Sequence, residues 1–100
     1  MKIVVTGIGI ISAIGCNKQE TLASIQAERS GVGAMRYLQS IHTHLPVGEV
    51  KMTDEALREA LNIPSQIAVG RTTLLGLAAA REALQDADIN DVSDMAFISG

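Results

Sequence analysis

Residues 69–87 read VGRTTLLGLAAAREALQDA and carry the strongest helical pattern in the chain. From Leu74 to Ala80 this stretch is apolar apart from the small residue Gly76. A helix built from it has no polar face for water over two turns, so other parts of a protein must cover it on most sides. The sequence therefore predicts a long helix that needs many apolar neighbours.

Two β-branched or apolar runs stand at the ends of the chain and favour buried strands. Residues 3–6 read IVVT and residues 95–99 read MAFIS. Such runs are typical of strands that are covered on both faces. A weaker run, LPVGEV at residues 45–50, predicts a short strand, which Pro46 places at an edge or at a strand start.

A first helix is predicted from Asn17 to about Arg29. Asn17 is a good N-cap, and Glu20 stands three residues later, where it can complete a capping box. We expect the helix to stop at Ser30-Gly31, because glycine adopts the left-handed conformation without Cβ strain.

A second helix is predicted after Thr53. Two acidic residues follow this threonine, and acids suit the first turn of a helix. Asn62 and Pro64 are expected to end it.

The predicted order is strand, helix, weak strand, helix, helix, strand. Such alternation indicates an α/β fold with parallel strands and crossover helices. Two good strands make a poor sheet, however, while the third helix demands cover on nearly all sides. We therefore expect residues 1–100, with no internal domain boundary, to be part of a larger fold or to be covered by a partner chain.

Composition narrows the function classes. The chain has 100 residues and 47% hydrophobic residues, with Tyr37 and Phe97 as its only aromatics, so its core must be aliphatic. The net charge of −3 and scattered basic residues argue against nucleic acid. A single cysteine fits a reducing compartment, and no apolar run is long enough for a spanning helix. We expect a cytoplasmic protein that does not enter a membrane.

The opening stretch, MKIVVTGIGIISAIGCNKQE, allows three interpretations. A short apolar run before Cys16 suggests a lipid-anchored surface module, but a capped helix follows at once where a flexible tether is expected. Gly7 and Gly9 suggest a dinucleotide loop, but Ser12 occupies the third glycine position. The simplest interpretation is that these glycines let a strand lie close to neighbouring backbone.

Other residues that could carry chemistry have weak patterns. Cys16 could be a nucleophile near a helix start, but inert packing is more common for a lone cysteine. His42 and His44 share an H-x-H spacing without a further metal ligand nearby. Asp86, Asp88, Asp91 and Asp94 lack the glycine and glutamate of a calcium loop, so we expect capping and solvation from them.

Arg71 stands at the start of the third predicted helix. A cation there opposes the helix dipole, which suggests a use elsewhere: an ion pair, an interface or a partner contact. A solvated arginine is the simpler alternative.

Three passages together resemble the N-terminal portion of the β-ketoacyl-acyl carrier protein synthases, condensing enzymes of the thiolase fold. IVVTGIGIISAIGCN at residues 3–17 resembles the opening strand and glycine turn of that family. ETLASIQAERSGVG at residues 20–33 is similar to its first helix, and residues 71–89 followed by MAFISG are similar to its alanine-rich helix and next strand.

The resemblance implies a partial thiolase-like fold, the N-terminal part of an α/β/α/β/α subunit. It implies that the whole protein performs a decarboxylative condensation of an acyl-enzyme with a malonyl thioester, using acyl carrier protein and no metal or nucleotide. The family's nucleophilic cysteine and two histidines come later in the chain, so no catalytic residue is carried over to Cys16, His42 or His44. The resemblance also implies a homodimer or heterodimer of the same fold.

Two departures from the family pattern keep alternatives open. Basic residues that would suit an acidic carrier protein precede the long helix in many members, whereas PSQIAVGR offers only Arg71. Asp88 stands where a glycine usually ends that helix; Asp can adopt the left-handed conformation at some cost. These differences leave room for a non-catalytic chain-length partner subunit of the same fold.

Overall fold

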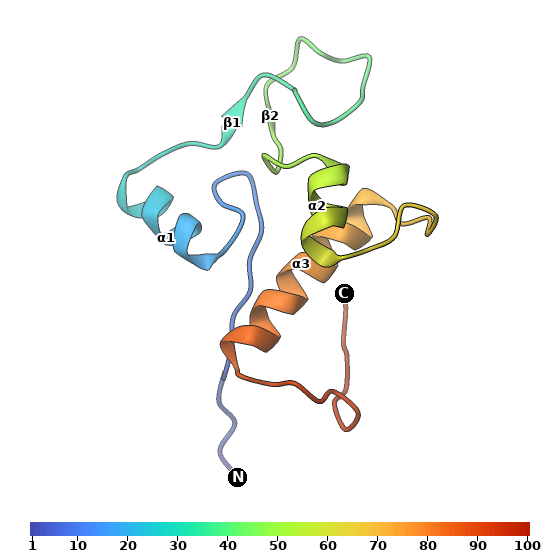
Figure 1. Ribbon diagram of the computed structural model, residues 1–100. Helices are drawn as coiled ribbons and strands as arrows, with labels where there is room; N and C mark the ends of the chain where they lie inside the picture. The colour runs from blue at the N-terminus through green and yellow to red at the C-terminus, as the bar shows by residue number, and fades with distance from the viewer.

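The computed structural model describes residues 1–100 as three helices and a two-stranded antiparallel sheet (Figure 1). The order along the chain is α1 (Lys18–Gln26), β1 (Val32–Gly33), β2 (Val47–Gly48), α2 (Asp54–Leu61) and α3 (Arg71–Asp86). The chain is thus mixed α/β, but the predicted parallel sheet is not formed within these residues.

The small core lies between α2 and α3. Leu57 of α2 and Leu74 of α3 are the two fully buried large side chains, with 1% and 0% of their surface exposed. Only six of the 100 residues are buried, and Leu77, one turn after Leu74, remains 44% exposed. The apolar stretch of α3 is therefore only partly covered by the chain itself, as its sequence predicted.

The predicted helix starts are confirmed. The side chain of Asn17 accepts a hydrogen bond from the Glu20 N–H at 2.8 Å, and Thr53 caps α2 in the same way through Ala56. Glu20 accepts from the Cys16 N–H at 2.6 Å, one residue before the position that a standard capping box uses.

The helix ends are decided by residues other than glycine. Asn62 ends α2 in the left-handed conformation, with φ of 56°, as predicted. The predicted stop at Ser30-Gly31 is wrong: α1 ends earlier, and Glu28 adopts the left-handed φ of 53°. Asp88 takes φ of 57° just after α3, which confirms that an aspartate can replace glycine there.

The two predicted terminal strands are wrong for this chain. Residues 3–6 and 95–99 form no strand, and their apolar side chains face solvent, with Ile3 89% and Phe97 85% exposed. Strands require a hydrogen-bonded neighbour, and no other segment of the chain pairs with either one. The weaker prediction at residues 45–50 is confirmed in a shorter form by β2.

Residues 1–11 are here called the N-terminal arm; the arm lies beside α3 from Gly7 onward, and its first residues extend past the end of that helix (Figure 1). The arm makes no backbone-to-backbone hydrogen bond. Instead, the Ile8 N–H donates to Asp86 at 3.0 Å and the Ile10 N–H donates to Glu82 at 2.9 Å. Gly7 and Gly9 lie against the backbone of α3, which confirms the close packing expected at these glycines, although the segment that carries them is not a strand.

Candidate binding cavity beside Cys16

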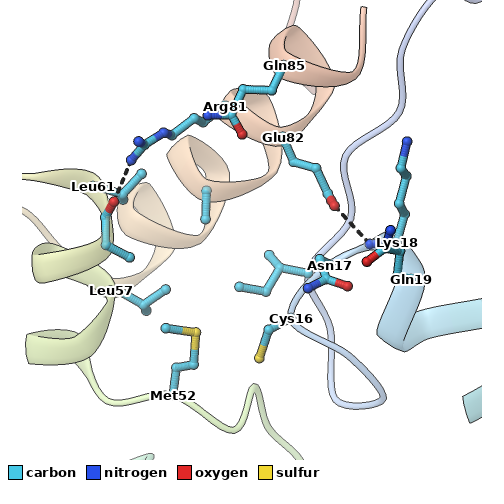
Figure 2. Close-up of a pocket in the computed structure, with 13 residues that line it drawn as sticks. Cys16, Asn17, Lys18, Gln19, Met52, Leu57, Leu61, Arg81, Glu82 and Gln85 are labelled. Carbon is cyan, nitrogen blue, oxygen red and sulfur yellow. Dashed lines mark hydrogen bonds between the residues drawn. The ribbon is translucent and has the colours of Figure 1, made fainter. Parts of the chain in front are cut away.

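A cavity of about 440 Å³ opens where the start of α1 faces α2 and α3 (Figure 2). Its apolar lining includes Met52, Leu57 and Leu61, and Cys16 approaches them from the opposite side. Lys18, Arg81 and Glu82 contribute polar groups. An apolar cavity with a few polar groups is the usual form of a ligand site.

Glu82 fixes the position of the cavity wall formed by α1. One of its carboxylate oxygens accepts a hydrogen bond from the Ile10 N–H at 2.9 Å, and the other accepts from the Lys18 N–H at 3.0 Å; Figure 2 shows the bond to Lys18. Lys18 is the first residue of α1, so its N–H has no partner within the helix. One side chain of α3 therefore joins the arm to the start of α1.

The cationic side chains at this cavity are already engaged. Arg81 donates to the carbonyl oxygen of Ala60 at the end of α2, and the Lys18 ammonium pairs with Asp86. The Arg81 contact joins α3 to α2, and the Lys18–Asp86 pair joins α1 to α3. Glu82 in the lining and Asp86 beside Lys18 offset the two positive charges of Lys18 and Arg81.

The Cys16 thiol is not activated. Burial raises its pKa above the usual value, and the charge of Glu20 and a hydrogen bond to that carboxylate raise it further. A nucleophilic cysteine needs the opposite, a lowered pKa that yields thiolate near neutral pH. The raised pKa favours the packing interpretation of Cys16 over the nucleophile.

The two histidines lie outside this cavity, in the loop between β1 and β2. The rings of His42 and His44 meet edge to face, with centroids 6.3 Å apart. No group of three His, Cys, Asp or Glu side chains is placed to hold a metal ion.

Three of the four aspartates near the C-terminus contribute to the structure of the chain. Asp86 pairs with Lys18 and holds the arm, Asp88 ends α3, and Asp91 accepts from the Ser93 N–H at 2.9 Å. No structural role is seen for Asp94. Asp88 matches the expected capping role, whereas Asp86 and Asp91 accept hydrogen bonds from backbone N–H groups outside the helix.

Arg71 forms the ion pair that was one of its expected uses. Its guanidinium donates to Asp54 at 2.7 Å and to the carbonyl oxygens of Met52 and Val50 at 2.9 and 3.0 Å. Its side chain is 17% exposed. Arg71 therefore joins the start of α3 to the start of α2.

Sequence reasoning missed two carboxylates. Glu82 stands four residues before Asp86 on α3, so both carboxylates lie on one face of the helix, and this spacing was the available signal. Glu49 is 3% exposed and accepts from the N–H groups of Arg36, Tyr37 and Leu38 at 2.6 to 3.0 Å. Nothing in the sequence around Glu49 indicates that it organises a loop.

Comparison with known proteins finds distant relatives of one kind. The 3-oxoacyl-[acyl-carrier-protein] synthase 1 of Buchnera aphidicola subsp. Acyrthosiphon pisum (strain APS) is 32% identical over 93 residues, which cover 89% of this chain and 21% of that protein. The Haemophilus influenzae (strain ATCC 51907 / DSM 11121 / KW20 / Rd) protein of the same name is 32% identical over 89 residues, or 88% of this chain and 21% of that protein. The chain resembles part of a ketoacyl synthase.

The chain spans about a fifth of the length of these curated relatives. No family model and no solved structure matches it. None of its helices combines the length and the apolar character that crossing a membrane requires.

Proposed function

We propose that this chain is the N-terminal segment of a 3-oxoacyl-[acyl-carrier-protein] synthase with a thiolase-like fold. The whole protein would take an acyl group from acyl carrier protein onto a cysteine and condense it with a decarboxylated malonyl thioester. Residues 1–100 alone would be inactive. The similarity to two synthases over nearly nine tenths of the chain carries this proposal.

The unpaired segments of the chain support the proposal. Residues 3–6 and 95–99 are apolar and β-branched or aromatic, yet they lie exposed and without hydrogen-bonded neighbours. Exposed apolar segments of this kind mark surfaces that another part of a protein covers. In the proposed whole protein both segments are strands of one sheet, and residues outside this chain cover the exposed side of α3 around Leu77.

The deciding experiment reads the coding sequence that follows residue 100 in the source genome and expresses the whole protein. We expect a downstream cysteine followed by two histidines. Purified protein given acyl- and malonyl-carrier protein should release carbon dioxide and form a 3-oxoacyl product. Its variant with that cysteine replaced by alanine should form no 3-oxoacyl product.

The same experiment separates the alternatives. A full-length chain in which another residue replaces the cysteine supports the non-catalytic partner subunit. A native protein that begins at Cys16 with a lipid adduct, seen by intact mass, supports the lipid-anchored module. A reading frame that ends at residue 100, with no carbon dioxide released by its product, contradicts the synthase.

The contact of Arg71 with a carrier protein or a subunit interface stays a prediction. Its guanidinium already has three partners within the chain. A carrier-protein contact would therefore have to use the exposed fraction of this side chain.

A further inference from the structure

A second cavity, of about 470 Å³, is lined by residues 12–16 and by side chains of α1, and it differs in character from the first. Arg29 and Lys51 line it, and we call it the Arg29–Lys51 cavity. Four of its twelve lining residues are hydrophobic, and several others carry hydroxyl groups. Glu20 is the one acidic residue in the lining, so the lining side chains carry a net positive charge, while the Glu49 carboxylate outside the lining lies near enough to Lys51 for their charges to interact.

Neither cation of this cavity forms a direct ion pair with a carboxylate, and Lys51 interacts with Glu49 only through the longer-range attraction of their charges. Arg29 directs Nε and Nη2 at the same hydroxyl oxygen, that of Ser24, at 3.2 and 3.0 Å. Lys51 donates to the carbonyl oxygens of Gly31 and Glu49, both at 2.9 Å. The two ion pairs of the chain, Lys18–Asp86 and Asp54–Arg71, involve other residues.

Several hydrogen-bond donors around the cavity lack an acceptor. Arg29 Nη1 makes no hydrogen bond, and Lys51 has used two of its three protons. The hydroxyl oxygens of Ser12 and Ser30 accept from the N–H groups of Ile14 and Val32, so their own protons are free to be donated. The only carboxylate in the lining, that of Glu20, is turned to the Cys16 N–H.

The positively charged groups and free hydroxyl donors of the Arg29–Lys51 cavity are suited to binding an oxyanion. A guanidinium fork, an ammonium and hydroxyl donors are the groups that proteins use to hold phosphoryl oxygens. The Ser24 hydroxyl holds two nitrogens of Arg29, which orients the fork before a ligand arrives and lowers the entropy cost of binding. Arg29 and Lys51 are also exposed, so a ligand can reach them from solvent.

We propose that the Arg29–Lys51 cavity binds a phosphoryl group. A tetrahedral phosphoryl group can accept from donors on several sides, whereas the planar carboxylate of a small organic acid uses fewer of them. This site is independent of the proposed synthase function, because neither thioester nor carrier protein takes part in the argument.

The test is a titration of the ¹⁵N-labelled 100-residue chain with inorganic phosphate, followed by NMR at constant ionic strength. We expect saturable shifts of the amide signals of Ser12, Ser30, Gly31 and Lys51, with a dissociation constant of about 1 mM. Acetate at the same concentration should give much smaller shifts. Equal response to acetate, or no saturable shift at these amides, overturns the proposal.

Variants localise the binding. Arg29→Gln and Lys51→Gln should each weaken phosphate binding about tenfold, since each removes a charged donor. Lys2→Gln is the matched control, because it removes one positive charge from a side chain that makes no hydrogen bond or ion pair. Helix content by circular dichroism identifies any variant that unfolds. Equal weakening by all three variants would show general charge attraction and contradict the site.

Discussion

Gly9 lies so close to Ala79 of α3 that no side chain fits between them: a Cβ added at Gly9 would stand 1.9 Å from the Ala79 carbonyl oxygen. A Cβ at Gly7 would stand 2.3 Å from the carbonyl oxygen of Ala83, one turn further along α3. Gly7 and Gly9, two residues apart in the arm, thus face the carbonyl groups of Ala83 and Ala79, which are four residues apart on α3 and lie on one side of that helix.

Gly9→Ala should displace the arm from α3 and lower the free energy of unfolding by about 1–3 kcal/mol, since the contact atoms are backbone and cannot move aside easily. Urea unfolding followed by circular dichroism measures the change. Gly76→Ala is the control, because a Cβ there meets nothing within 4 Å and alanine favours the middle of a helix by about 0.5–1 kcal/mol. Equal stability of the Gly9 variant and the parent would contradict the packing.

Leu74→Ala should destabilise the chain by about 2–5 kcal/mol, because this side chain is fully buried against α2. Leu77→Ala on the exposed side of α3 should cost less than about 1 kcal/mol in the isolated chain. Thermal melts of both variants test this difference. If Leu77→Ala proved as costly as Leu74→Ala, a self-associated form of the chain would already cover that side.

Arg71→Met should cost about 1–3 kcal/mol, because it leaves the Val50 and Met52 carbonyls without their donor. Asp54→Asn should cost less than about 1 kcal/mol, since Asp54 is 48% exposed and water screens its ion pair. Denaturant melts of both single variants provide the comparison. A larger loss for Asp54→Asn would show that the carboxylate, rather than the two carbonyls, holds the start of α3.

Glu49→Gln should loosen the loop between β1 and β2. Burial works to raise the pKa of Glu49, but the N–H groups of residues 36–38 and the charge of Lys51 outweigh it, and the pKa is lowered. Removing the charge weakens those three hydrogen bonds. Amide hydrogen exchange of residues 36–38 should become faster, while exchange within α3 stays unchanged; unaltered exchange in the loop would contradict this role.

Acid should release the N-terminal arm. The hydrogen bond from Lys18 and the one from the Ile8 N–H lower the pKa of Asp86 in the folded chain. Its contribution to stability is therefore present above the unfolded pKa of about 3.9 and is lost as the pH falls through the lower folded value. Exchange at the Ile8 amide, followed from pH 6 downward, should show this loss.

Asp86→Asn provides the matched variant for the acid experiment. It should show faster exchange at Ile8 even at pH 6, with little further change in acid. If the parent and Asp86→Asn lose protection at the same pH, another group controls the arm.

The sequence alone determined where the three helices of this protein begin, and where α2 ends, but not where α1 ends. Asn17 and Thr53 start α1 and α2, Asn62 ends α2, and the apolar stretch after Arg71 forms α3, because caps and helical periodicity act over a few neighbouring residues. The sequence also indicated that α3 needs further neighbours, because this helix has more apolar residues on its surface than a short chain can cover.

Only the tertiary structure decided what residues 3–6 and 95–99 become, and where the carboxylates act. A strand exists only when another segment completes its hydrogen bonds, so the β-branched pattern of IVVT could not by itself produce one. Glu49, Glu82 and Asp86 hold backbone N–H groups between 11 and 78 residues away, and no local pattern encodes such distant partners. Helix caps depend on residues that are neighbours in the sequence, whereas these contacts form only when folding brings distant elements together.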